Sequence, residues 1–250
     1  MHWIDDGLIL SARKYGENSV IIQALTREHG RHAGLVRGGS GKRLRGILQP
    51  GNEVGLRWNG RLSEQLGTYS VEAKKSSGAV LFDQPLSLAA ASASLGILEK
   101  VLPEREGHPA LFEATLLLVK HLSGEIIHWG PLLVKWELGL LAEMGYGLDL
   151  SECAATGTTK DLIYVSPKSG RAVCEGAGAP YREKLLPLPN FLRLNADEQA
   201  IGVSLSDISS GLILSGYFIH KNLLPHYADA TLPARERFMV SVERRINAIG

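Results

Sequence analysis

Short apolar runs separated by glycine, asparagine and proline dominate the first eighty residues of the chain. Residues 53–58 alternate polar and apolar side chains, which is the pattern of a strand with one buried face. Similar runs lie at residues 8–15, 20–25, 33–36 and 66–71. No helical spacing connects them, so the pattern predicts a small closed barrel of five strands rather than an open α/β sheet.

The pattern changes to helical spacing after residue 80. Residues 85–102 are rich in alanine and leucine, and Pro103 follows as a helix stop. Four more segments place apolar side chains three and four positions apart and are predicted to be helices: 109–122, 132–144, 205–224 and 234–249. The sequence therefore predicts an α+β protein, with a barrel domain at residues 1–80 and a helical domain at residues 81–250.

One stretch, residues 148–200, interrupts the helical region. Two short apolar runs at 163–165 and 171–173 flank the turn Ser-Pro-Lys-Ser-Gly at 166–170, which is typical of a hairpin. A tail with three prolines follows and is predicted to be a loop. We expect this stretch to form a small β insertion within the helical domain.

The formal net charge of +1 conceals an asymmetry along the chain. Residues 1–80 hold 12 Lys and Arg against 7 Asp and Glu, a net charge of +5. The remaining residues hold 15 Lys and Arg against 19 Asp and Glu, a net charge of −4. A basic module joined to a mildly acidic one indicates that the N-terminal part meets a polyanion.

Three observations bear on the compartment. No run reaches the roughly 18 apolar residues that a membrane span needs. The N-terminal residues lack a basic segment followed by a long apolar one, and two cysteines are too few for a disulfide framework. We therefore expect a cytoplasmic protein with no membrane partner.

The strongest functional signal is the stretch LVRGGSGKRLRGILQPG at residues 35–51. No carboxylate occurs between Glu28 and Glu53, so its cations have no acidic neighbours in sequence. A flexible glycine-rich loop with uncompensated cations could bind a phosphate backbone, but a solvated hairpin tip has the same composition. The cations in this loop are Arg37, Lys42, Arg43 and Arg45.

A phosphate-binding P-loop is excluded for this stretch. The motif needs a glycine five positions before Gly41, where Val36 stands, and a hydroxyl residue after Lys42, where Arg43 stands. The surroundings are also predicted to be strands, with no helix following. The histidines are scattered and no catalytic constellation is evident, so we expect no enzymatic turnover.

The two cysteines, Cys153 and Cys174, suggest a degenerate metal-binding knuckle. A closed zinc site needs four ligands, usually from two Cys-x-x-Cys pairs. Here Thr156 and Ala177 stand where the second cysteine of each pair would be, and no histidine is near in sequence. Because two thiolates bind zinc weakly, we expect no metal and no other cofactor.

Aromatic side chains are few in the N-terminal module. Bases of single-stranded nucleic acid usually stack on such side chains, and some of these must fill the barrel. We therefore expect at most one or two stacking platforms and a binding mode dominated by phosphate contacts. The four aromatic residues are Trp3, Tyr15, Trp58 and Tyr69.

A series of short motifs runs through the whole chain in a fixed order. They are GLIL at 7–10, YGENS at 15–19, TREHG at 26–30, LRG at 44–46, LQP at 48–50, LPE at 102–104, ALF at 110–112, ELGLL at 137–141, GYGLDL at 145–150, Cys153, and SPKSG at 166–170. With these motifs the chain resembles the RecO family of bacterial recombination-mediator proteins.

The resemblance implies an N-terminal OB-fold and a helical domain that carries a zinc-knuckle-like insertion. It implies binding of single- and double-stranded DNA in the nucleoid, annealing of complementary strands, and action with RecR. It further implies loading of RecA onto single-stranded DNA covered by the binding protein SSB, whose acidic, Phe-terminated tail is recognised. Many family members have four cysteines in the insertion, and this chain departs from them at Thr156 and Ala177.

These considerations give two sets of candidate residues. For DNA phosphates they are Arg37, Lys42, Arg43 and Arg45, with Lys14 and Arg31 as weaker candidates. For the SSB tail, an apolar groove on the helices with a cation beside it is expected, and the candidate cations are Arg105, Lys120 and Lys135. The alternatives are an RNA-binding or protein-scaffolding barrel and, supported only by the incomplete P-loop, an enzyme.

Overall fold

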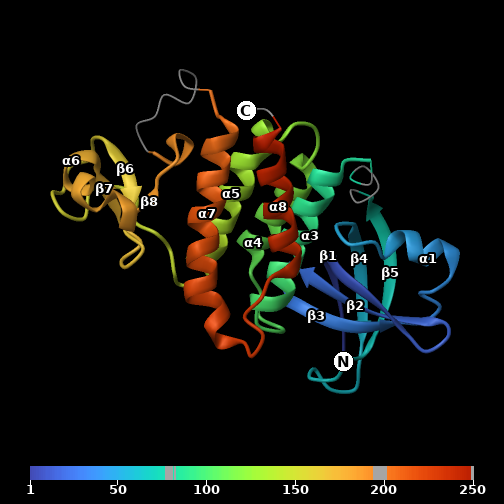
Figure 1. Cartoon of the computed structure of the whole chain (residues 1–250). Coiled ribbons are helices and arrows are strands. Elements are labelled where there is room, and N and C mark those ends of the chain that lie inside the picture. Colours follow the sequence, from blue (N-terminus) through green and yellow to red (C-terminus); the bar gives the residue numbers. More distant parts are fainter. Residues whose placement is uncertain (77–80, 82, 194–201, 249–250) are drawn as a thin grey trace. The chain divides into compact units, whose positions relative to one another are not determined.

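The structure is a computed structural model that describes residues 1–250 except 77–80, 82, 194–201 and 249–250. Figure 1 shows the ribbon coloured along the sequence. The chain divides into two compact units. The first comprises Met1–Gly124 and Leu232–Phe238, and the second comprises Glu125–Thr231 and Met239–Gly250. Each unit is described by itself below.

The predicted five-stranded barrel is confirmed in the first unit. The strands close in the order β1-β2-β3-β5-β4, with β3 and β5 in parallel contact only at Leu35 and Thr68. Alternate side chains fill the barrel, and among them Ile9, Ile22 and Val54 are fully buried. The strands are β1 (His2–Tyr15), β2 (Ser19–Thr26), β3 (Gly30–Val36), β4 (Glu53–Asn59) and β5 (Thr68–Lys75).

Strand β1 is longer than the apolar pattern predicts, because it begins at His2 rather than near residue 8. Residues 2–8 pair with β4 and residues 7–15 pair with β2, and the pairing with β2 shifts its register between Ile9 and Ser11. Asp5 interrupts the apolar pattern, yet it is buried, and its carboxylate accepts hydrogen bonds from the backbone amides of Glu28 and His29. A strand with such a buried carboxylate has no simple apolar alternation.

An aromatic and imidazole cluster fills one part of the barrel interior. The Tyr69 hydroxyl lies 3.0 Å from Nδ1 of His32, and Trp58 packs against the His32 ring with centroids 5.4 Å apart. Gly34 makes room for this packing, because a Cβ there would collide with the Tyr69 ring. Burial lowers the pKa of His32, so the neutral ring is favoured in the folded barrel.

The first unit also contains the helices α3 (Pro85–Val101) and α4 (Pro109–His121), close to the predicted ranges. The segment between them docks on the turn that joins β2 to β3. The amide of Arg105 donates to the Arg31 carbonyl at 2.9 Å. Gly30 has a φ of +64° and lies so close to the Glu106 carbonyl that no Cβ would fit, which explains the glycine at this turn.

The second unit is built around two packed helices, α5 (Ile126–Glu143) and α7 (Leu205–Phe218). A Cβ at Gly130 would lie 2.7 Å from Ile208, so the two helices approach closely there. The prediction started α5 after Pro131, at residue 132, but the helix begins at Ile126. Proline removes one backbone hydrogen bond, and the buried residues Ile126 and Trp129 hold the preceding turn in place.

The chain beyond α7 is also helical. A π-helical segment (Ile219–Leu223) and a 3-10 segment (Leu224–His226) continue α7, as the predicted range 205–224 required. The last helix, α8, covers Pro233–Asn247, and the predicted end at residue 249 lies outside the described residues.

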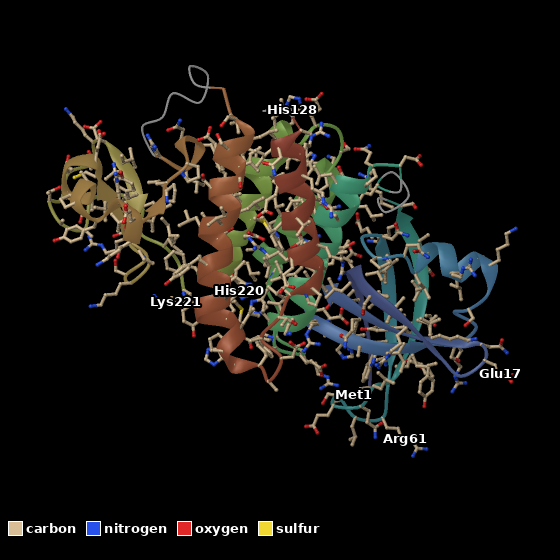
Figure 2. All side chains as sticks on the ribbon, viewed as in Figure 1. Met1, Glu17, Arg61, His128, His220 and Lys221 are labelled. Atoms are coloured by element: carbon tan, nitrogen blue, oxygen red, sulfur yellow. The ribbon has the colours of Figure 1, made fainter. Side chains whose placement is uncertain are left out.

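The predicted β insertion is confirmed, with one additional strand. Strands β6 (Leu162–Val165) and β7 (Ala172–Cys174) form the hairpin, and β8 (Leu186–Pro187) pairs with β6 in a segment that was predicted to be a loop. The helical turns α6 (Glu175–Gly178), η1 (Ala179–Lys184) and η2 (Asn190–Leu192) surround them. Lys221, labelled in Figure 2, donates to the Pro167 and Lys168 carbonyls at 2.6 and 3.1 Å and so ties the hairpin turn to the end of α7.

The two cysteines lie together inside this insertion. The Cys174 amide donates to Sγ of Cys153 at 3.3 Å, and Oγ1 of Thr156 lies 3.6 Å from Sγ of Cys174. Burial alone would raise the pKa of the Cys153 thiol. Hydrogen bonds from the Thr156 side chain and from nearby backbone amides outweigh that effect and lower the pKa to about 6.

This donor set does not fit zinc. Within the ranges that the structure describes, no group of three or more His, Cys, Asp or Glu side chains could hold a metal ion. Thr156 takes the place of a ligand but acts as a hydrogen-bond partner of the thiols. The bond from the Cys174 amide to Cys153 and the contact of Thr156 with Cys174 connect the two cysteine segments of the insertion.

The predicted domain division stays a prediction. Its boundary at residue 80 and the predicted end of the insertion at residue 200 both lie outside the described residues.

The first prediction concerns His32 and acid. The unfolded ring has an ordinary pKa of 6.5 and binds a proton more readily than the folded ring, so the free energy of unfolding should fall as the pH falls through that value. His32→Gln should reduce this loss between about pH 7 and pH 5, measured by urea unfolding. The exposed His2→Gln control should keep it, and an undiminished loss in His32→Gln would contradict the assignment.

The second prediction concerns the Cys153 thiol. Because the folded pKa lies below the ordinary value of 9.0, the thiolate should add stability that is present at high pH and lost as the pH falls through about 6. In a Cys174→Ser background, Thr156→Val should raise the Cys153 pKa by about one unit, measured by the ultraviolet absorbance of the thiolate. Thr159→Val, in an exposed position nearby, should leave the titration unchanged.

Candidate nucleic-acid interface

A short helix carries most of the candidate cations. Helix α1 (Lys42–Ile47) follows β3 after a turn and precedes β4. Leu48 is buried in the barrel core, and Leu44 and Ile47 pack against that core. Since residues three and four apart share one face of a helix, this apolar face fixes the rotation of α1 on the barrel.

The cations occupy the rest of the helix surface. Lys42, Arg43 and Arg45 are exposed, and so is Arg37 at the end of β3. Among the described residues, no ion pair joins any of these four to a carboxylate. Their charges are therefore available to an external anion.

The prediction of a flexible loop here, with no helix following, is wrong. Six residues give too short a pattern to be recognised as helical, and the flanking glycines suggested a loop. The P-loop remains excluded by Val36 and Arg43, which replace its glycine and its hydroxyl residue.

Specific contacts define both ends of the helix. Before α1, Gly38 has a φ of +69°, and the Ser40 amide donates to the Asn18 carbonyl at 3.3 Å. After α1, the Asn52 side-chain amide donates to the carbonyls of Gly46 and Ile47 at 3.0 and 3.1 Å. These carbonyls would otherwise lack partners at the helix end, so Asn52 acts as its cap.

The hairpin that joins β1 to β2 lies beside the turn before α1 (Figure 1), as the contact between Ser40 and Asn18 requires. It carries Arg13 and Lys14, both exposed, and Glu17, which is labelled at its tip in Figure 2. Lys14 and Arg45 line the same hollow of about 400 Å³ between this hairpin and α1. The structure thus brings the weaker candidate Lys14 next to the stronger ones.

Arg31 is placed differently from the other candidates. Its Nε donates to the Leu102 carbonyl at 2.8 Å, and its guanidinium lies 3.3 Å from the Glu104 carboxylate. Only 15% of the side chain is exposed. Arg31 lies at the start of β3, whereas Arg37 follows the end of that strand, so the two candidates are at opposite ends of it.

The aromatic residues divide as the sequence suggested. Trp58 and Tyr69 are buried in the barrel, and Trp3 stacks on His29 with ring centroids 4.1 Å apart. Tyr15 is 58% exposed at the end of β1. Tyr15 is therefore the aromatic side chain of this set that is best placed to stack on a base.

The three candidates for the SSB tail lie in three different settings. Arg105 donates to the Glu64 carbonyl at 2.8 Å and is engaged near the barrel. Lys135 is exposed on α5 in the second unit. Lys120 lies at the end of α4 and borders a pocket of about 380 Å³, whose apolar side chains include Leu8, Leu117 and Val119.

Sequence reasoning missed the hollow between the hairpin and α1. It identified the cations by their charge, but the neighbouring residues Ala12, Ser40 and Gln49 carry no such signal. Ala12 and Lys14 are two apart in a strand and share a face, which is the clue that could have connected them.

No helix of the described ranges is long and apolar enough to cross a membrane.

Comparisons with known proteins match both parts of the chain to one family. Residues 1–76 match the family described as "Recombination protein O N terminal", and residues 83–228 match "Recombination protein O C terminal". The chain is 47% identical over 241 residues to the DNA repair protein RecO of Rhodospirillum centenum, covering 96% of this chain and 94% of the relative.

Two further relatives carry the same name. The DNA repair protein RecO of Methylocella silvestris is 46% identical over 246 residues, covering 98% of this chain and 97% of the relative. The DNA repair protein RecO of Brucella abortus is 42% identical over 248 residues, covering 99% of this chain and 98% of the relative. On these matches, across both the barrel and the helical part, the chain belongs to the RecO family of DNA repair proteins, which are non-enzymatic recombination mediators.

Proposed function

We propose that the barrel binds the DNA backbone through the cations on and around α1. The observation that carries this proposal is a helix fixed by its apolar face, with exposed cations that have no acidic partner in the described structure. Phosphate contacts of this kind release counterions and carry little sequence information. The contacting residues are Arg37, Lys42, Arg43, Arg45 and Lys14. Arg31, held by Glu104, serves to position the start of β3.

The same surface supports strand annealing. Two complementary strands repel each other through their phosphates, and a fixed group of cations reduces that repulsion without any covalent step. Tyr15, which is exposed on the outward-facing side of β1 at the same hairpin, adds an aromatic face for an unpaired base.

We further propose that the chain acts with RecR to help load RecA onto single-stranded DNA covered by SSB. Membership of the RecO family supports interaction with DNA and RecR. The pocket at α4 supports recognition of the acidic, Phe-terminated SSB tail. Its apolar side chains, including Leu8 and Leu117, would receive the phenylalanine ring, and Lys120 would pair with the terminal carboxylate.

Two carboxylates also border that pocket, Glu53 and Glu113, and they would repel an acidic peptide. Arg27 forms an ion pair with Glu113, which reduces the negative charge at that side. Lys75 lies beside Glu53 on the border of the pocket. Arg27 and Lys75 therefore offset the charges of Glu113 and Glu53, and Lys120 adds one further positive charge.

The test of DNA binding is a salt titration with labelled single-stranded DNA. Each phosphate that is neutralised on a single strand contributes a slope of about −0.7 in a plot of log affinity against log salt. Replacing Arg37, Lys42, Arg43 and Arg45 by alanine should flatten the slope by about two units or more. All four side chains are exposed, so the fold should be retained.

A second quadruple variant controls for net charge. In this variant alanine replaces four exposed cations in or near the β insertion, which are Lys160, Lys168, Arg182 and Lys184. This variant should keep the slope of the original protein. If the first variant keeps that slope as well, α1 is not the DNA site. Tighter binding of RNA of the same sequence would favour an RNA-binding barrel instead.

The test of the SSB tail uses a peptide that ends in acidic residues and phenylalanine. Lys120→Glu should weaken binding about tenfold or more, because a charge-assisted contact is replaced by repulsion. Lys135→Glu makes the same charge change on α5 and should have little effect on the affinity. With a control peptide that lacks the terminal phenylalanine, Lys120→Glu should also change the affinity little. Loss of binding in Lys135→Glu alone would move the site away from the α4 pocket.

A further inference from the structure

We propose that the hollow between the β1–β2 hairpin and α1 holds one unpaired nucleotide of a single strand. The inference rests on the proposed DNA binding and adds to it a site for a base. The hollow measures about 400 Å³, within the range of pockets that receive small-molecule ligands. Among its described lining residues none is a carboxylate.

The register of the barrel explains where the hollow lies. Lys14 pairs with Val20 across β1 and β2, and Val20 pairs with Val36 across β2 and β3. Residues directly opposite each other point to the same side of a sheet. Val20 and Val36 belong to the barrel core, so Lys14 is on the inward-facing side of β1, at the exposed end of the barrel.

Helix α1 supplies the other wall. Leu48 is buried in the core just after α1, and Arg45, three positions earlier, lines the hollow with it. The two cations therefore come from separate elements, Lys14 from β1 and Arg45 from α1. Between them the lining is apolar at Ala12, Val20 and Leu48.

This combination matches the chemistry of a nucleotide. A phosphate needs cations, and the faces of a base need apolar contact, whereas the edge of a base needs hydrogen-bonding groups. Arg45 and Lys14 provide the cations for the phosphate. Val20 and Leu48 provide apolar contact for the base, and the hydroxyl of Ser40 provides a hydrogen-bonding group for its edge. Inorganic phosphate alone would use only the cations and would leave the apolar lining without a function.

The hollow is built into the fold before any ligand arrives. The turn at its rim is held by the bond from Ser40 to Asn18 and by the Gly41 amide, which donates to the Gly38 carbonyl at 3.0 Å. Gly39 packs against Val20, where an added Cβ would lie 2.9 Å from the valine Cβ. A rim fixed in this way reduces the entropy that is lost on binding.

The site distinguishes single strands from duplexes. A paired base is stacked within the helix and must be unpaired and unstacked before it can enter a pocket, which costs free energy. Contacts to phosphate alone carry no such distinction. Occupation of this hollow would therefore favour single-stranded DNA, beyond what the α1 cations provide.

The experiment fills the hollow without changing charge. Ala12 is exposed on β1 and lines the hollow, so Ala12→Leu should occupy it and leave the barrel folded. Ala73→Leu is the matched control, because Ala73 is an exposed strand residue of the same barrel that does not line the hollow. Affinities of the full chain are measured for labelled oligothymidylate, for a duplex of equal length and for an abasic strand.

Ala12→Leu should weaken binding of oligothymidylate about fivefold or more, because the burial of about 40 Å² of apolar base surface is worth that factor. Duplex affinity, abasic-strand affinity and the salt slope should stay unchanged, and Ala73→Leu should resemble the original protein throughout. Equal affinity of Ala12→Leu for oligothymidylate, or an equal loss on the abasic strand, would overturn the nucleotide site while leaving the α1 cations intact. Absence of DNA binding by the original protein would overturn both proposals.

Discussion

Burial of one apolar face of α1 against the barrel determines how this protein presents its charge. Leu44, Ile47 and Leu48 pack on the barrel core, so the cations of the same short segment are turned toward the exposed side of α1. Exposed cations on a free loop would lose conformational entropy when they bind a phosphate chain. Here the apolar contact and the Asn52 cap have fixed the backbone in advance, so less of the binding energy is needed for ordering.

The barrel interior supports this arrangement with polar groups as well as apolar ones. His32 and Tyr69 share a hydrogen bond in the interior, and Asp5 accepts backbone amides from the β2–β3 turn. Buried polar groups of this kind stabilise one register of a sheet, because a shift of one residue would leave them unpaired. The register in turn places Lys14 on the same side of the sheet as Val20.

Much of the fold could be predicted from the sequence, because alternation and helical spacing reflect burial directly. The features that were missed depend on context. The first half of β1 contains a buried Asp5, α1 is too short to show a period, and β8 contains Pro187, which is tolerated because β8 lies at the edge of its sheet. In the candidate site, charge identified the cations. The engagement of Arg31 by Glu104 could not be predicted, since they are far apart in sequence.

Strand β3 separates the surface at its start, which is covered by the segment before α4, from the cationic surface of α1 at its end. Its first residue, Gly30, is covered by the segment before α4, and its last residue, Val36, leads to the α1 cations. Seven residues of strand span about 20 Å from first to last, more than twice the Debye length of about 8 Å at physiological salt. Charges at one end of this strand are therefore electrically independent of those at the other. A polyanion bound beside α1 would therefore leave the electrostatics of the Arg31 end undisturbed at physiological salt.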